Sequence, residues 1–199
     1  HIPLDAHAFL TDVTSAYAVL GVMGPRSRDL LSRLTNADLS NDAFPYLSSR
    51  EIDVGYAPVR ATRITYVGEL GWELYVPTEF AAHVYDAIVA EGDNHGLRLA
   101  GYHALESLRM EKAYRAWGTD LTDLDTPLEA GLRFAVAFDK PFEFTGKEAL
   151  LAQAERPATK RLTVFTLDDP EPLLLGDEPI YRDGALAGRT TSGAFGYTL

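Results

Sequence analysis

The sequence contains no cysteine among its 199 residues. This absence excludes a disulfide framework, a thiol nucleophile and a thiolate metal site. The sequence also lacks a run of about 18 apolar residues and a signal-peptide pattern, so we expect a soluble chain without a membrane span. Its five histidines do not have the spacing of a metal site, and we expect no bound metal.

Basic residues are also scarce, with 18 Lys and Arg against 29 Asp and Glu and a formal net charge of −11. A chain this acidic is not expected to bind nucleic acid or an anionic membrane through its overall field. An anionic ligand would therefore need local cations. The length and the 46% hydrophobic content are sufficient for a real core and indicate one or two domains.

Hydrophobic periodicity predicts an alternation of strands and helices in the first part of the chain. In the helix predicted at 100–112, we expect Ala104, Leu105 and Leu108 to face inward. Thr78 is the expected N-cap of the helix before it. The predicted elements are strands at 14–22 and 52–56, a hairpin at 63–76, and helices at 26–34, 80–92 and 100–112.

The second part of the chain reads differently. An irregular stretch begins at Trp117, and a capping box of Thr145 and Glu148 predicts a helix up to about residue 154. The segment 155–158 has the composition of a boundary, which predicts domains at 1–155 and 156–199. Strands are predicted at 132–138, 161–167, 178–181 and 185–191, the last two joined by a turn at Asp183-Gly184.

The predicted hairpin at 63–76 holds two carboxylates and two aromatic side chains within eight residues: Tyr66, Glu69, Trp72 and Glu73. We expect Tyr66 and Glu73 on opposite strands, where a flat ring could stack on an aromatic side chain while a carboxylate accepts N–H donors from the ring's edge. Glu69 is expected to be solvated in the turn. The alternative is that the hairpin only packs against the core, as most such hairpins do.

The stretch Tyr66-Val-Gly-Glu-Leu-Gly-Trp-Glu-Leu74 resembles the Y-T-G-E-x-G-[FWY]-E-[IL] signature of the folate-binding aminomethyltransferase family, which includes the glycine cleavage T-protein. Residues 19–25, 104–120 and 126–132 also resemble family segments. Leu105 replaces an Arg of the T-protein motif, and Lys112 follows Glu111. These departures make the chain look more like the C-terminal region of dimethylglycine and sarcosine dehydrogenases. The implied fold class is α+β, a T-protein-like folate-binding domain followed by the start of a C-terminal antiparallel β-barrel domain.

The resemblance implies site residues. Glu73 matches the Glu that holds the pteridine ring of tetrahydrofolate, and Tyr66 matches a Tyr that contacts the folate. Arg109 matches an Arg that would face the folate tail or brace Glu73; its alternative is a surface pair with Glu106. Trp72 and Trp117 either line the pocket or pack in the core.

Other charged side chains near this motif have weaker signals. Lys112 and Arg115 form either a local cationic patch or solvated helix ends. Asp120, Asp123 and Asp125 hint at a calcium loop, but the glycine and the closing Glu are missing, which favours solvated loop positions.

The resemblance also implies a function. An upstream flavin domain, binding FAD, would oxidise an N-methyl amine to an iminium, and this region would let tetrahydrofolate capture the carbon. No G-x-G-x-x-G fingerprint is present, and the catalytic Asp of the family is expected N-terminal to this region, so we expect a fragment that is inactive alone. The expected location is the cytoplasm, or the mitochondrial matrix in a eukaryote. The alternatives are a glycine cleavage T-protein, a non-catalytic folate-binding scaffold, and a piece that only packs against its parent.

Overall fold

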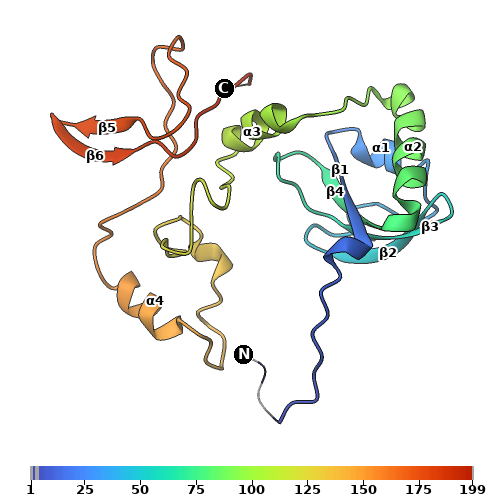
Figure 1. The fold of residues 1–199 in the computed structure, drawn as a ribbon, viewed down its shortest axis with the longest axis horizontal. Coiled ribbons are helices and arrows are strands. Elements are labelled where there is room, and N and C mark those ends of the chain that lie inside the picture. Colours follow the sequence, from blue (N-terminus) through green and yellow to red (C-terminus); the bar gives the residue numbers. More distant parts are fainter. Residues whose placement is uncertain (1, 3–4, 199) are drawn as a thin grey trace. The chain divides into compact units, whose positions relative to one another are not determined.

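The computed structural model describes Ile2 and residues 5–198 (Figure 1). The chain divides into an N-terminal unit, His1–Gly101, and a C-terminal unit, Tyr102–Leu199, which are described separately. The strands of the N-terminal unit are β1 (Tyr17–Met23), β2 (Ser49–Val54), β3 (Ala57–Thr62) and β4 (Gly71–Pro77). Its helices are α1 (Ser27–Leu31), α2 (Ala81–Gly92) and the 3-10 helices η1 (Thr14–Ala16), η2 (Thr78–Phe80) and η3 (Asp93–His95).

The four strands form one antiparallel sheet in the order β1-β4-β3-β2. Because successive side chains of a strand point to opposite faces, β4 places Trp72, Leu74 and Val76 on the inner face. All three are fully buried in one core cluster with Val84 and Ile88 of α2. Burial of one such aliphatic side chain contributes about 1.5–3 kcal/mol. The other residues of β4 therefore lie on the outer face of the sheet.

The predicted hairpin is displaced along the chain. Its return strand is confirmed as β4, but its first strand is β3, and residues 63–70 form the connection between them. The side chain of Arg63 donates to the carbonyl of Phe44, and the hydroxyl of Thr65 accepts from the backbone of Val67. These bonds hold the connection away from the ladder. The alternation that defines β3 is Ala57, Val59 and Ala61, all buried.

Other N-terminal predictions hold in type but differ in extent. The strand predicted at 14–22 begins at Tyr17, and the helix predicted at 26–34 is the shorter α1. The helix predicted at 80–92 is confirmed as α2. Thr78 is not its N-cap, because the Thr78 hydroxyl donates to the carbonyl of Ser15 at 3.0 Å and makes no cap bond.

The described part of the C-terminal unit contains α3 (Tyr102–Glu111), the 3-10 helix η4 (Arg133–Ala135), α4 (Lys147–Ala154), β5 (Pro179–Arg182) and β6 (Ala185–Arg189). β5 and β6 form an antiparallel hairpin, and its predicted turn is confirmed. Asp183 and Gly184 have φ values of 52° and 79°, as a two-residue hairpin turn of primed type requires. The helices and antiparallel sheets of both units confirm the α+β class.

Four predictions in this unit are wrong. Residues 132–138 contain η4 where a strand was expected, and residues 161–167 form no strand. The capping box at Thr145 is absent: Gly146 precedes α4 in the left-handed region at φ 92°, without a side-chain cap bond. The buried residues of α3 are Ser107 and Arg109, while Leu108 is 39% exposed, so the expected apolar inner face is not observed.

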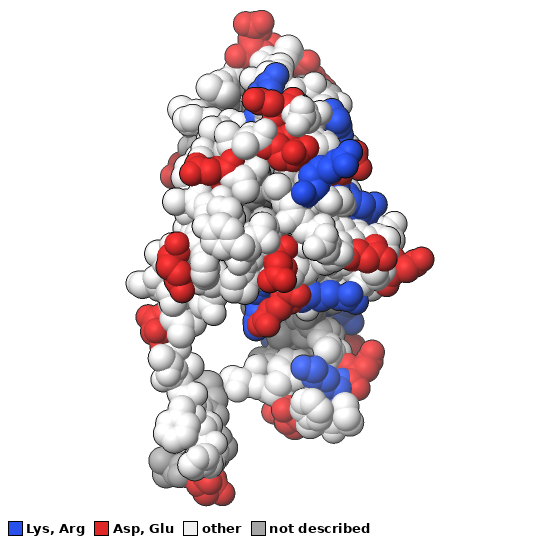
Figure 2. All heavy atoms as spheres, turned by 90° about the vertical axis from the view of Figure 1, so that its right-hand side faces the viewer, with Lys and Arg blue, Asp and Glu red and all other residues white. Residues whose placement is uncertain are grey.

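The surface drawn in Figure 2 shows acidic and basic side chains interspersed. Among the described residues, none of the helices has both the length and the apolar composition needed to cross a membrane.

Candidate functional site

Glu73 lies in the middle of β4, on the outer face of the sheet. The register pairs it with Gly21 of β1 on one side and with Thr62 of β3 on the other. Its side chain is half-buried. The neighbouring residue Trp72 faces the core, so the alternation of the strand alone turns the Glu73 carboxylate outward.

The carboxylate of Glu73 is held by a residue two positions along the same strand. The hydroxyl of Tyr75 donates to Oε2 of Glu73 at 2.9 Å. This hydrogen bond, together with burial and the negative charge of Glu73, raises the pKa of Tyr75. No other described residue donates a hydrogen bond to Glu73. A carboxylate has about four acceptor positions, so the site retains acceptors for a pair of N–H groups on a ligand.

Tyr66 lies in the connection 63–70, where it is half-buried. The expectation that Tyr66 and Glu73 occupy opposite strands of a hairpin is therefore wrong, because only Glu73 is on a strand. Glu69 is exposed in the same connection, as expected.

Trp72 packs in the core of the N-terminal unit. Its side chain is fully buried, and its ring meets Phe44 edge-on, with centroids 6.2 Å apart and planes at 71°. The guanidinium carbons of Arg28 and Arg63 lie 5.9 and 5.8 Å from its ring centroid. Such contacts stabilise an aromatic side chain through the attraction of a cation to the ring. The placement of Trp72 agrees with the alternative of core packing.

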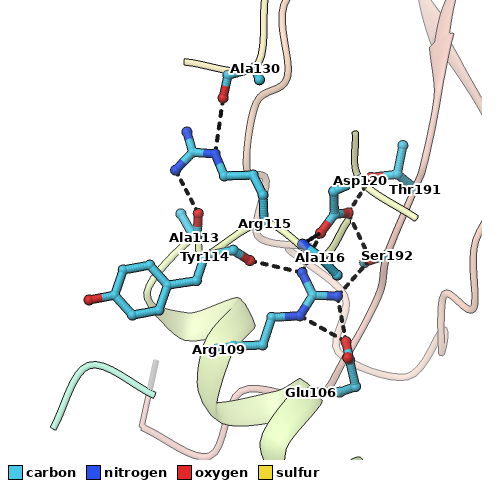
Figure 3. A network of polar contacts seen from close by, with 10 residues as sticks. All are labelled: Glu106, Arg109, Ala113, Tyr114, Arg115, Ala116, Asp120, Ala130, Thr191 and Ser192. Carbon is cyan, nitrogen blue, oxygen red and sulfur yellow. Dashed lines mark hydrogen bonds and ion pairs between the residues drawn. The ribbon is translucent and has the colours of Figure 1, made fainter. Parts of the chain in front are cut away.

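Arg109 is the centre of a polar network in the C-terminal unit (Figure 3). Its Nε and Nη2 donate to Glu106, its Nη1 donates to Asp120 and to the carbonyl of Tyr114, and its Nη2 also donates to Ser192. An arginine guanidinium has about five N–H donors, and these bonds use all of them. The side chain of Arg109 is 1% exposed. The pairing with Glu106 is present, but it is buried on the arginine's side and is not a surface pair.

Asp120 was expected to be a solvated loop residue, and that expectation is wrong. Its side chain is 7% exposed and forms an ion pair with Arg109. Burial raises the pKa of Asp120, but hydrogen bonds from Thr191, the backbone of Ala116 and Ser192, with the charge of Arg109, together lower it below its ordinary value.

The network contains residues that the sequence analysis missed. A buried arginine requires a counter-ion, so an acidic residue after α3, such as Asp120, could have been predicted as the partner of Arg109. Thr191 and Ser192 could not be found in this way, because they lie 71 and 72 residues beyond Asp120 in the sequence.

Trp117 and Arg115, two other residues of the C-terminal unit that were singled out in the sequence, are not among the described hydrogen-bond partners of Arg109. The side chain of Trp117 is 72% exposed, and its backbone forms an isolated bridge with Leu121. Arg115 donates to the carbonyls of Ala113 and Ala130. A cavity of about 300 Å³ is lined by residues that include Arg109, Arg115, Asp120, Arg161, Phe165 and Arg189.

Within Ile2 and residues 5–198, no group of three or more His, Asp or Glu side chains is arranged to hold a metal ion. The carboxylates with described partners accept hydrogen bonds from hydroxyls, backbone amides, basic side chains or, for Glu91, also from the side-chain amide of Asn94.

Comparison with known proteins identifies relatives for both parts of the chain. The model of the GCVT N-terminal domain matches residues 1–140, and the model of the glycine cleavage T-protein C-terminal barrel domain matches residues 160–199. The mitochondrial pyruvate dehydrogenase phosphatase regulatory subunit of Mus musculus is 45% identical over 204 residues, covering 100% of this chain and 23% of that protein. The mitochondrial dimethylglycine dehydrogenase of Homo sapiens is 42% identical over 192 residues, covering 96% of this chain and 22% of that protein.

A solved structure extends the likeness to the fold. The glycine cleavage system aminomethyltransferase T from Bartonella henselae matches with a TM-score of 0.74 and 25% identity, covering 90% of this chain and 48% of that chain. The chain thus spans less than a quarter of the length of the two relatives above. These matches confirm the resemblance inferred from the motifs around Glu73 and Arg109, including its dehydrogenase branch.

Proposed function

The chain belongs to the family of the glycine cleavage T-protein, and from this premise we propose that it is the tetrahydrofolate-binding region of a dimethylglycine- or sarcosine-dehydrogenase-like protein. In this proposal the methylene carbon of an iminium, derived from an N-methyl amine, is transferred to tetrahydrofolate, its bond to the amine nitrogen breaks, and the demethylated amine is released. Tetrahydrofolate supplies the nucleophilic nitrogen when it is bound. The chain's own residues bind and orient it, and no covalent enzyme intermediate is required.

The observation that carries the proposal is the carboxylate of Glu73, which faces outward beside Gly21 and is held by Tyr75. The edge of a pterin ring presents an amino group and a ring N–H, and a carboxylate accepts two such parallel donors in a charge-assisted pair. The Tyr75 bond restricts the rotation of Glu73, so less side-chain freedom is lost when a ligand binds.

Further parts of the proposal rest on the resemblance. Tyr66 is proposed to contact the folate, with Arg109 and Trp117 as further cofactor-binding candidates; Trp72, buried in the core, is proposed to support the strand that carries Glu73. In the described geometry, Arg109 donates only to groups of its own unit, so its proposed role is to shape the loop that carries Trp117. Residues 1–155 are proposed as the folate-binding domain and 156–199 as the beginning of the barrel domain.

The proposal also concerns the larger protein. FAD in an upstream domain of the same polypeptide would generate the iminium, and the catalytic carboxylate would lie outside the region described above. The proposed location is the cytoplasm, or the mitochondrial matrix in a eukaryote; the dimethylglycine dehydrogenase and the phosphatase subunit named above are mitochondrial.

Calorimetric titration with tetrahydrofolate tests the proposal. Glu73→Gln keeps the size of the side chain but removes its charge, and we expect a loss of about 1.5–3 kcal/mol in binding free energy, the value of a hydrogen bond to a charged group. Glu69→Gln is the matched control, because it makes the same charge change at an exposed position of the adjoining connection. An affinity that is equal in wild type and Glu73→Gln, or absent in wild type, would sink the proposal.

A second candidate is a regulatory role in which folate binds without reaction. The relative at 45% identity over the whole chain is a phosphatase regulatory subunit, which favours this candidate. The two candidates are separated by measuring 5,10-methylenetetrahydrofolate formation from an N-methyl amine. Binding of tetrahydrofolate without product formation by the complete polypeptide would support the regulatory role.

A further inference from the structure

Gly21 lies in β1, and neither its backbone conformation nor its contacts with the described residues explain why it is a glycine. Its φ is not in the left-handed region that favours glycine. A Cβ built on it would have one described neighbour within 4 Å, the Cε of Met23 at 3.6 Å, which is an ordinary contact. Neither the backbone nor the packing of the described residues therefore requires a glycine here.

The nearby glycines behave differently. A Cβ on Gly71 would lie 2.7 Å from Cγ of Met23, and Gly24 has a φ of 131°. Packing explains the first and backbone conformation explains the second. Gly21 is also unfavourable for the strand, because a glycine loses more conformational freedom on folding than any other residue. A glycine inside a strand often marks a place where a ligand approaches the backbone closely.

The register of β1 and β4 shows which side chains surround Gly21. Gly21 is the direct partner of Glu73 in the antiparallel pair, so both lie on the outer face of the sheet. The next outer-face residues of β1 are Val19, which is 53% exposed, and Met23, which is half-buried. Both are apolar and stand on either side of the missing side chain. The backbone at Gly21 is thus open beside an acceptor and bordered by apolar groups.

We propose that Gly21 is a specificity-determining position: a flat heteroaromatic ring with adjacent N–H donors on its edge lies over the Gly21 backbone while Glu73 accepts from that edge. This inference rests on the proposed function, which assigns the pterin ring to Glu73. It adds that the ring occupies the β1 side of the carboxylate. A side chain at residue 21 would fill the volume proposed for the ring, and its Cβ would meet only Cε of Met23 within 4 Å among the described residues.

The test uses Gly21→Val and Gly21→Ala with calorimetric titration of tetrahydrofolate and of 6-methyltetrahydropterin, which carries the ring without the folate tail. Thermal unfolding of each variant is measured alongside. We expect Gly21→Val to fold with an unchanged or higher Tm and to bind both ligands at least tenfold more weakly, with a smaller loss for Gly21→Ala. Gly188→Val is the matched control, because Gly188 lies in β6 and a Cβ there would meet nothing within 4 Å.

The outcomes separate this inference from the proposed function. If wild type binds, Glu73→Gln binds weakly and Gly21→Val binds like wild type, the placement over Gly21 is overturned while the proposed function stands. If Gly21→Val does not fold, Gly21→Ala decides in the same way, because its added methyl group makes only an ordinary contact. If wild type binds neither ligand, the proposed function and this inference are both overturned. Loss of affinity in Gly188→Val equal to that in Gly21→Val would also overturn the inference.

Discussion

Replacing Arg109 by methionine tests the energetic role of the network in the C-terminal unit. Methionine keeps most of the aliphatic stem but removes the charge, leaving Asp120 buried without its cation. Breaking a buried ion pair by removal of one partner costs about 3–5 kcal/mol. Asp120 is 7% exposed and keeps its bonds from Thr191 and Ser192, which places the expected loss at the lower end of that range, about 3 kcal/mol. Glu106 adds little, because its side chain is 43% exposed and can be rehydrated.

Native-state hydrogen exchange of the amides of α3 measures this loss in the unit that contains the network. A decrease of about 3 kcal/mol in opening free energy corresponds to exchange that is faster by about 100-fold. Arg60→Met is the matched control, because the Arg60–Glu51 pair is exposed on both sides, at 62% and 77%. An exposed pair of this kind contributes about 0–1 kcal/mol. The reasoning is refuted if α3 exchanges at the same rate in Arg109→Met as in Arg60→Met.

Two further predictions concern titratable groups. Because the folded-state pKa of Tyr75 is raised, its bond to Glu73 stabilises the fold fully below about pH 10 and the contribution is lost as pH rises through that higher pKa. Urea unfolding of Tyr75→Phe, followed by the fluorescence of the buried Trp72, should show a deficit of about 1 kcal/mol at pH 8 that disappears in strong alkali; a deficit independent of pH contradicts the role of the hydroxyl. The pKa of Asp120 is lowered instead, so its contribution is present above about pH 4 and is lost as pH falls through the lower folded value. The stability difference between wild type and Asp120→Asn should therefore be largest near neutral pH and shrink toward pH 2, and an equal difference at both pH values in urea unfolding would count against the ion pair.

Elements that depend on local pattern were predicted well. The periodicity around Val84 and Ile88 identified α2, and the Asp183-Gly184 turn identified the hairpin of β5 and β6. Both signals are carried by neighbouring residues, so no distant contact is needed to interpret them. The displaced hairpin is a failure in which a weak local pattern competes with a distant bond. The alternation at 63–66 resembles a strand, but the bond from Arg63 to the carbonyl of Phe44 holds these residues in the connection.

The candidate site also has features that the sequence predicts and features that depend on distant contacts. The sequence by itself determined the family, through the Tyr66–Leu74 motif, in which Glu69 and Glu73 are the two carboxylates. Only the tertiary structure decided that Gly21 lies beside Glu73, because these paired residues are 52 positions apart in the chain. Likewise only the fold brings Ser192 to Arg109. The two residues are 83 positions apart, and the hydroxyl of Ser192 carries no charge that would mark it in the sequence as a partner of Arg109. Local periodicity specifies which face of an element is buried, whereas the partner across that face is set by chain topology.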